Sequence, residues 1–145
     1  MLTNRSVPAE TLLPHVVYHD VVEAIAWLGR AFGFAEHYRY GDDPVAGAQV
    51  YLGNAWIMLE RARTGTATPA ETRHLSQYLT LFVGDLDAHY AHAVDVGVTI
   101  VETPSVTVYG EYQYVALDLA GHRWIISQHA KDVRPQDWGA RVAGQ

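Results

Sequence analysis

Residues 53–60 read GNAWIMLE, and residues 121–128 read GHRWIISQ. The two stretches align at a constant offset of 68 residues, with the glycine, the tryptophan and the first isoleucine identical and Glu60 opposite Gln128. Each is a β-rich run that follows a glycine-containing turn, which is typical of a strand. A period this long, present in only two copies, does not fit a solenoid and predicts a duplicated module.

The same order of elements precedes each copy of the repeat. One strand leads into an amphipathic helix, which starts at an aspartate N-cap and ends at a glycine, Asp20 and Gly33 in the first half and Asp85 and Gly97 in the second. Three strands follow each helix. The expected strands are 12–18, 35–40, 46–52 and 55–61, then 75–83, 98–102, 107–117 and 123–129. The sequence therefore predicts an α+β fold of two tandem βαβββ modules, forming a cup-shaped, mostly antiparallel sheet with helices on the outside.

The segment between the two halves is rich in Thr, Ala, Gly and Pro, which is typical of a linker. The two ends of the chain are polar and are expected to be arms, although Trp138 in the second arm is expected to dock. The predicted boundaries are a domain over 12–130 with modules 12–61 and 75–129, a linker over 62–74, and arms over 1–11 and 131–145.

Composition excludes several classes of function. The 145 residues include no cysteine, which rules out disulfides, thiol catalysis and cysteine-ligated metals. Ten basic against sixteen acidic residues give a net charge of −6 with no Lys/Arg cluster, so no nucleic-acid partner is expected. No apolar run suggests a membrane span or signal peptide, so we expect a cytoplasmic protein that binds a neutral or cationic small molecule.

Three short motifs carry a family resemblance. They are HVVYHD at residues 15–20, AFGF at residues 31–34, and Asp118-x-x-Gly121-His122-x-Trp124. With the duplicated βαβββ order, residues 12–130 resemble the vicinal oxygen chelate superfamily, which includes glyoxalase I, bleomycin-resistance proteins and extradiol dioxygenases. The resemblance implies a homodimer and a small molecule bound inside the cup, and it spans both enzymes and pure binding proteins.

Enzymes of that superfamily hold one metal ion with His, Glu or Gln from four strands. Carried over by resemblance, these positions are Leu13, Ile57 or Met58, Tyr78, and Ile125 or Ile126 in this sequence. Aliphatic and thioether side chains offer no hard donor to a divalent cation, and Tyr is an uncommon ligand. We therefore expect no cofactor. The alternative is a displaced metal held by His15, Glu60 and Gln128, because His15 shares a strand face with Leu13.

Polar and aromatic residues near the mouth of the expected cup are candidates for ligand binding. Alternation places Tyr112 and Tyr114 on one strand face and Glu111 and Gln113 on the other. Tyr109 and Glu111 are therefore candidates at the mouth of the cup. The full set of predicted ligand-binding residues is Leu13, His15, Ile57, Tyr78, Tyr109, Glu111, Ile125 and Ser127.

Other side chains admit both functional and structural interpretations. His15 and Tyr78 are candidates for a metal-free acid–base pair. Trp56 and Trp124 could form stacking walls for a flat ligand, but are interpreted as core residues beneath the helices. His89 and His92 could bind a metal, but are interpreted as part of a solvated helix face. The favoured function is binding of a small, possibly cationic or aromatic, molecule in a metal-free cup. The alternatives are a metal-dependent lyase, isomerase or dioxygenase of the glyoxalase type, and an accessory protein whose cup has no ligand.

Overall fold

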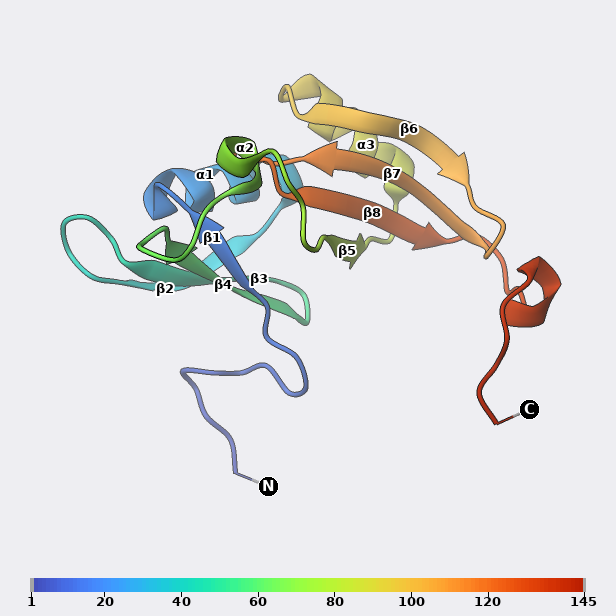
Figure 1. Cartoon of the computed structure of the whole chain (residues 1–145), viewed down its shortest axis with the longest axis horizontal. Helices are drawn as coiled ribbons and strands as arrows, with labels where there is room; N and C mark the ends of the chain where they lie inside the picture. The colour runs from blue at the N-terminus through green and yellow to red at the C-terminus, as the bar shows by residue number, and fades with distance from the viewer. Residues whose placement is uncertain (1, 145) are drawn as a thin grey trace. The chain divides into compact units, whose positions relative to one another are not determined.

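A computed structural model describes residues 2–144 of the chain. The chain divides into two compact units, each built around one four-stranded mixed sheet (Figure 1). The first unit runs to Leu75 and includes Leu119–His122, and the second holds Ser76–Asp118 and continues from Arg123. The predicted α+β class with two modules is confirmed. Within residues 2–144, no helix has the length and apolar character needed to cross a membrane.

The first unit follows the predicted βαβββ order. Its elements are β1 (His15–Tyr18), α1 (Val21–Phe32), β2 (Ala35–Tyr40), β3 (Gly47–Leu52), β4 (Ala55–Arg61) and α2 (Pro69–Thr72). The strand order is β1-β4-β3-β2, with β1 parallel to β4 and the other neighbours antiparallel. Helix α1 begins where the Asp20 side chain accepts a hydrogen bond from the Glu23 amide, and it ends at Gly33 in the left-handed conformation, as predicted.

The second unit repeats this arrangement. Its elements are β5 (Leu79–Phe82), α3 (Leu86–Asp95), β6 (Thr99–Val106), β7 (Glu111–Leu117), β8 (Arg123–His129) and the 3₁₀ helix η1 (Pro135–Trp138). The strand order is β5-β8-β7-β6, with β5 parallel to β8. Trp138 contacts Tyr109 with ring centroids 5.7 Å apart, so the second arm does dock within its own unit.

Several element boundaries differ from the prediction. The first strand begins at His15 because Pro14 lacks the amide that a ladder requires. The segment 107–110 forms a turn instead of the start of a strand, since the Thr107 carbonyl accepts from the Gly110 amide. The expected linker contains α2, a single helical turn closed by a capping box between Thr68 and Glu71.

The two tryptophans of the sequence repeat lie on opposite faces of their sheets. Two residues connect β3 to β4, whereas five connect β7 to β8. The two connections thus differ in length by an odd number of residues. Because side chains alternate between the two faces of a strand, an odd shift moves each side chain to the opposite face. Trp124 is buried on the helix side, as predicted, with its indole nitrogen 3.1 Å from the Asp118 carboxylate. The same prediction for Trp56 is wrong, because Trp56 shares a face with Met58 and Glu60, away from α1.

Candidate functional site

Each sheet has one face covered by a helix and one open face. In the first unit α1 contacts β2, β3 and β4, and in the second α3 contacts β6, β7 and β8. The helix face of the second sheet is apolar and buried, with Trp124 and Ile126 on β8 and Tyr114 on β7. The alternate residues on these strands face the other way. These open-face positions carry the polar side chains of Glu111, Gln113, Ser127 and His129 as well as the apolar Val115 and Ile125. The polar side chains are the candidates for contact with a ligand.

Two of these open-face side chains converge on the carboxylate of a third, Glu111. Glu111 begins β7 and pairs with His129 at the end of β8. Its Oε1 lies 2.6 Å from His129 Nδ1, and its Oε2 accepts a hydrogen bond from the Ser127 hydroxyl at 2.7 Å. Ser127 is fully buried, the Glu111 side chain is 18% exposed, and the His129 side chain is 77% exposed. The strand pairing therefore holds the carboxylate in one orientation at the border between core and solvent.

The electrostatic state of Glu111 follows from these contacts. Burial alone would raise the pKa of Glu111, but the hydrogen bonds from Ser127 and His129 and the charge of His129 outweigh it. The pKa of Glu111 is therefore held below its ordinary value of 4.5. Glu111 is an anion at neutral pH, and it is the fixed negative charge of this cluster.

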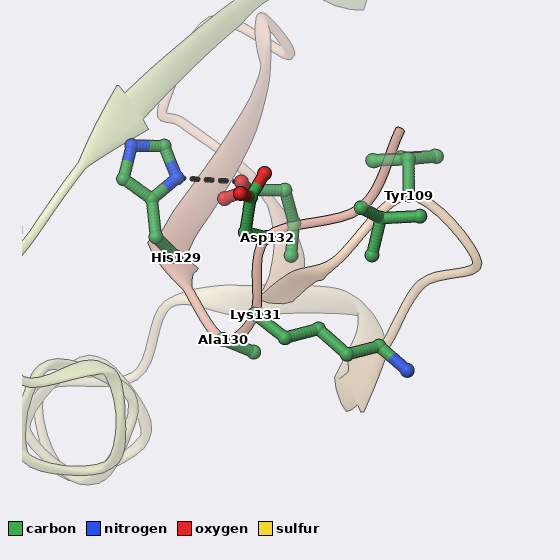
Figure 2. Close-up of a pocket in the computed structure, with 7 residues that line it drawn as sticks. Tyr109, His129, Ala130, Lys131 and Asp132 are labelled. Atoms are coloured by element: carbon green, nitrogen blue, oxygen red, sulfur yellow. Dashed lines mark hydrogen bonds and ion pairs between the residues drawn. The ribbon is translucent and has the colours of Figure 1, made fainter. Parts of the chain in front are cut away.

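A pocket of about 530 Å³ opens beside this carboxylate (Figure 2). It is lined by Tyr109, Glu111, His129 and the segment 130–133 that follows β8. Gly110 lets this segment approach, because its φ is +92° and a Cβ there would lie against the Lys131 carbonyl. The Gly110 carbonyl in turn accepts from the amides of Ala130 and Lys131, at 2.8 and 3.1 Å. The glycine thus positions the wall of the pocket.

The cluster contains a serine, a histidine and an acid, but it is not arranged for nucleophilic catalysis. In such a triad the serine hydroxyl donates to the histidine, which the acid orients. Here Ser127 and His129 bind different oxygens of Glu111, so both act on the carboxylate. The arrangement can hold a negative charge in place and present it to a ligand.

The structure brings three predicted ligand-binding residues, Tyr109, Glu111 and Ser127, into this one cluster. Ile125 lies on the same face of β8, two residues before Ser127. Sequence reasoning missed His129. The signal was available, because β-strand alternation from Ser127 places residue 129 on the same face.

The predicted residues of the first unit form a separate group. His15 on β1 lies 2.7 Å from the Glu60 carboxylate on β4, with side-chain exposures of 53% and 28%. Leu13 lies two residues before His15 and precedes the strand. Ile57 does not line the open face: it is buried on the helix side, whereas Met58 shares the face of His15 and Gln49. Of the two residues considered in β4, Met58 is therefore the one that lies on the open face.

The remaining candidates lie in the second unit. Tyr78 precedes β5 and is 56% exposed, and its ring lies 5.6 Å from the Arg123 guanidinium carbon. The Gln128 oxygen accepts from the Leu86 amide at the start of α3, so this side chain lies on the helix face, away from the open one. The prediction of a solvated His89 is wrong, since its Nδ1 lies 2.6 Å from the Tyr114 hydroxyl in a partly buried contact.

The side chains present do not fit the metal centre that the fold family implies. The positions carried over from that family hold Leu13, Ile57 or Met58, Tyr78, and Ile125 or Ile126, which together provide one weak oxygen donor. Across residues 2–144, no three His, Asp or Glu side chains gather closely enough to hold a metal ion.

The fold defines a class of protein: small α+β proteins of two βαβββ modules, each with a long helix packed on one face of its sheet. A family model described as the Glyoxalase/Bleomycin resistance protein/Dioxygenase superfamily matches residues 12–126, and the chain belongs to this superfamily.

Similar proteins agree with that assignment. The crystal structure of TioX from Micromonospora sp. ML1 superposes with a TM-score of 0.68 at 25% identity, covering 86% of this chain and 100% of that one. The fosfomycin resistance protein FosX of Listeria monocytogenes shares the fold, with a TM-score of 0.63 at 11% identity over 88% of this chain and 96% of its own. An uncharacterized protein of Mycobacterium tuberculosis is 26% identical over 92% of this chain and 83% of its own length.

Proposed function

We propose that this protein binds a small organic cation in the pocket beside Glu111, without a metal ion. The observation that carries the proposal is the ionised Glu111 carboxylate, held by Ser127 and His129 at a pocket of about 530 Å³. A carboxylate whose orientation is already fixed loses little conformational freedom when a ligand arrives, which favours affinity. The volume lies within the range of small-molecule sites, about 300–1,000 Å³.

The charges around the pocket favour a cation. Two carboxylates, Glu111 and Asp132, line it with one ammonium group, Lys131, and with the His129 imidazole, which already contacts Glu111. Figure 2 shows the Lys131 side chain extending away from His129. Tyr109 adds an aromatic ring, which attracts cations through its negative face. The net charge of −6 acts in the same direction at long range.

The proposal also includes the location, oligomeric state and partners of the protein. The protein is expected to act in the cytoplasm as a homodimer, with no nucleic-acid or membrane partner. Light scattering coupled to size-exclusion chromatography measures the oligomeric state directly. A mass of one 16.1 kDa chain would remove the dimer from the proposal and leave the Glu111 pocket, which the second unit forms by itself.

Calorimetric titration with benzylamine and benzyl alcohol tests the cation site. The two probes share a ring, but only the amine is charged at pH 7. We expect the amine to bind about tenfold more tightly or better, because a charge-assisted hydrogen bond is worth roughly 1.5–3 kcal/mol. Glu111→Gln should abolish that preference, whereas Glu60→Gln, in the first unit, should preserve it. Equal binding of the two probes, or an unchanged preference in Glu111→Gln, would contradict the proposal.

The second candidate is a metal-dependent lyase, isomerase or dioxygenase. The His15–Glu60 pair favours it, because histidine and glutamate are suitable ligands for such metals and lie 2.7 Å apart on the open face. Elemental analysis of protein purified without chelator distinguishes the two functions. This candidate requires a stoichiometric divalent metal that is lost in His15→Ala, and the metal-free binding site requires none.

A further inference from the structure

The N-terminal arm meets the open face of the first sheet through a single backbone carbonyl. The Tyr38 hydroxyl donates to the Ser6 carbonyl at 2.9 Å, and the Gln49 side-chain amide donates to the same oxygen at 3.3 Å. These donors come from neighbouring strands, β2 and β3, on which Tyr38 and Gln49 are directly paired. Two donors that converge on one carbonyl oxygen satisfy both of its lone pairs.

The donors are held in place by other side chains. Gln49 is fully buried, an unusual place for an amide on the face of a sheet. Its oxygen lies 2.6 Å from His37 Nδ1, and its nitrogen also lies 3.4 Å from the Met58 sulfur. These contacts fix which end of the amide is the donor and aim it at Ser6. Contacts within the sheet therefore orient the Gln49 amide toward Ser6.

Aromatic rings lie beside these donors. Trp56 stacks on Tyr51 with centroids 4.8 Å apart, and His37 lies edge-on to Trp56 at 5.4 Å. A pocket of about 300 Å³ separates Trp56 and Asn54 from arm residues 8–12. The site thus combines two hydrogen-bond donors for a carbonyl oxygen with an aromatic surface beside them. This combination is suited to a peptide group with an apolar substituent.

The arm itself buries little apolar surface. Leu2 and Leu12 are 95% and 78% exposed, and residues 2–7 are exposed throughout. Its turn is closed internally, by the Asn4 carbonyl and side chain accepting from the Val7 and Ser6 amides. Because hydrophobic burial does not anchor it, exchange of two hydrogen bonds is enough to release its carbonyl.

We propose that the open face of the first sheet is a recognition site for an amide carbonyl, and that the Ser6 carbonyl is its resident internal occupant. A peptide-like ligand that brings a carbonyl and an adjacent apolar group displaces the arm. The inference concerns the first unit alone and does not rest on the proposed cation site at Glu111.

The test separates the arm from the folded protein. A specific protease site inserted between Thr11 and Leu12, both exposed, allows the arm to be cut after folding. The probe is a synthetic peptide of residues 1–11, titrated by calorimetry into the same sample before and after cleavage. Before cleavage the tethered arm competes at an effective concentration in the millimolar range, so we expect binding at least about tenfold weaker than afterwards.

Matched peptides identify the group that is recognised. Replacing the Ser6–Val7 amide by a CH₂–NH linkage removes the carbonyl and should weaken binding about tenfold, since two hydrogen bonds are lost. The same replacement at Leu2–Thr3 is the control and should leave affinity unchanged within about twofold. Tyr38→Phe in the cleaved protein should weaken binding of the unmodified peptide about fivefold.

The fate of the cut arm and the affinities of the modified peptides decide whether the sheet recognises the Ser6 carbonyl. Retention of the cut arm on the protein, or its release followed by saturable rebinding, supports the proposal. A cleaved protein that neither retains nor rebinds the peptide, with an unchanged circular dichroism spectrum, overturns it. Equal affinity for the two modified peptides also overturns it, because the site would then not recognise the Ser6 carbonyl.

Discussion

The open faces of the two sheets place their polar groups differently. In the second unit, Glu111 receives hydrogen bonds from Ser127 and His129 beside a pocket of about 530 Å³. In the first, the central group is the neutral, fully buried Gln49, which donates to the chain's own Ser6. The carboxylate of that face, Glu60, pairs with His15 and both remain partly exposed. The two modules thus share a scaffold and differ in the chemistry of the open face.

The length of one hairpin connection contributes to this difference. Two residues join β3 to β4 and five join β7 to β8, and the longer connection belongs to the first unit. There the Ala120 carbonyl accepts from the Ala70 amide at 2.9 Å, and the His122 ring donates to the Val17 carbonyl at 2.7 Å. The changed length reverses the faces of the last strand, so similar sequences present different side chains to solvent.

Substitution of the two tryptophans should give the largest difference between the units. Trp124→Ala removes a fully buried indole and leaves the Asp118 carboxylate without this donor, so we expect a loss of about 3–5 kcal/mol of unfolding free energy. Trp56→Ala removes a half-buried ring stacked on Tyr51 and should cost about 1–2 kcal/mol. Urea denaturation followed by circular dichroism measures both. Equal losses would mean that the two tryptophans are equivalent after all.

The sequence predicted the elements well and the equivalence of the repeats poorly. The helices are bounded by local signals, such as the Asp20 cap and Gly33, that act within a few residues. The face of Trp56 depends on how many residues the turn before it uses, and an alignment of letters carries no such information. The alignment of residues 53–60 with residues 121–128, at an offset of 68, matches identical residues. It wrongly predicted the sheet faces on which Trp56 and Ile57 lie.

Removal of a tyrosine hydroxyl should cost more unfolding free energy on the helix face than on the open face, by less than the difference between the two tryptophans. Tyr114 is fully buried, and burial raises its pKa above the ordinary value, so its hydroxyl stays protonated and bonds to His89. Tyr114→Phe should cost about 1–3 kcal/mol, because it leaves a partner without its hydrogen bond inside the protein. Tyr38→Phe, on the open face of the first unit, should cost about 0.5–1 kcal/mol.

The same denaturation measurement at pH 7 compares these two variants. Both replacements keep the ring, so differences in packing are small and the hydroxyl is the variable. A larger loss for Tyr38→Phe than for Tyr114→Phe would show that the arm contact, and not the helix contact, is the stronger of the two.

The candidate site was predicted in part. Glu111, Ser127 and Tyr109 were expected to bind a ligand; Tyr109 and Glu111 line one pocket, and the buried Ser127 hydrogen-bonds to Glu111 beside it. The sequence could not show which side chains approach Glu111, since that depends on the pairing of β7 with β8. Nor could it show that Gln128 turns to the start of α3, or that the arm reaches Gln49, because both contacts join residues more than forty positions apart.

Removal of the Ser127 hydroxyl tests how much this hydrogen-bond partner lowers the pKa of Glu111. Ser127→Ala deletes a hydrogen bond that lowers the pKa of Glu111, so this pKa should rise toward 4.5. The native contacts of the ionised carboxylate stabilise the fold above its ordinary pKa, and this contribution is lost as the pH falls through the lowered native pKa. In Ser127→Ala this contribution should therefore be smaller, and its loss should be complete at a higher pH. Carbon-13 NMR titration of the Glu111 carboxyl measures the change, and an unmoved titration would exclude Ser127 as a cause.

The smallest effect is expected at the carboxylate of the other open face. Glu60→Gln removes the ion pair with His15, whose side chain is 53% exposed, and such pairs are screened by water. We expect the unfolding free energy at pH 7 to change by less than about 0.5 kcal/mol. Glu111→Gln should cost more than Glu60→Gln, because it weakens contacts with the fully buried Ser127 as well as with His129. A Glu60→Gln loss as large as that of Glu111→Gln would mean that both sheets hold a built carboxylate site, and that the two faces differ less than their contacts indicate.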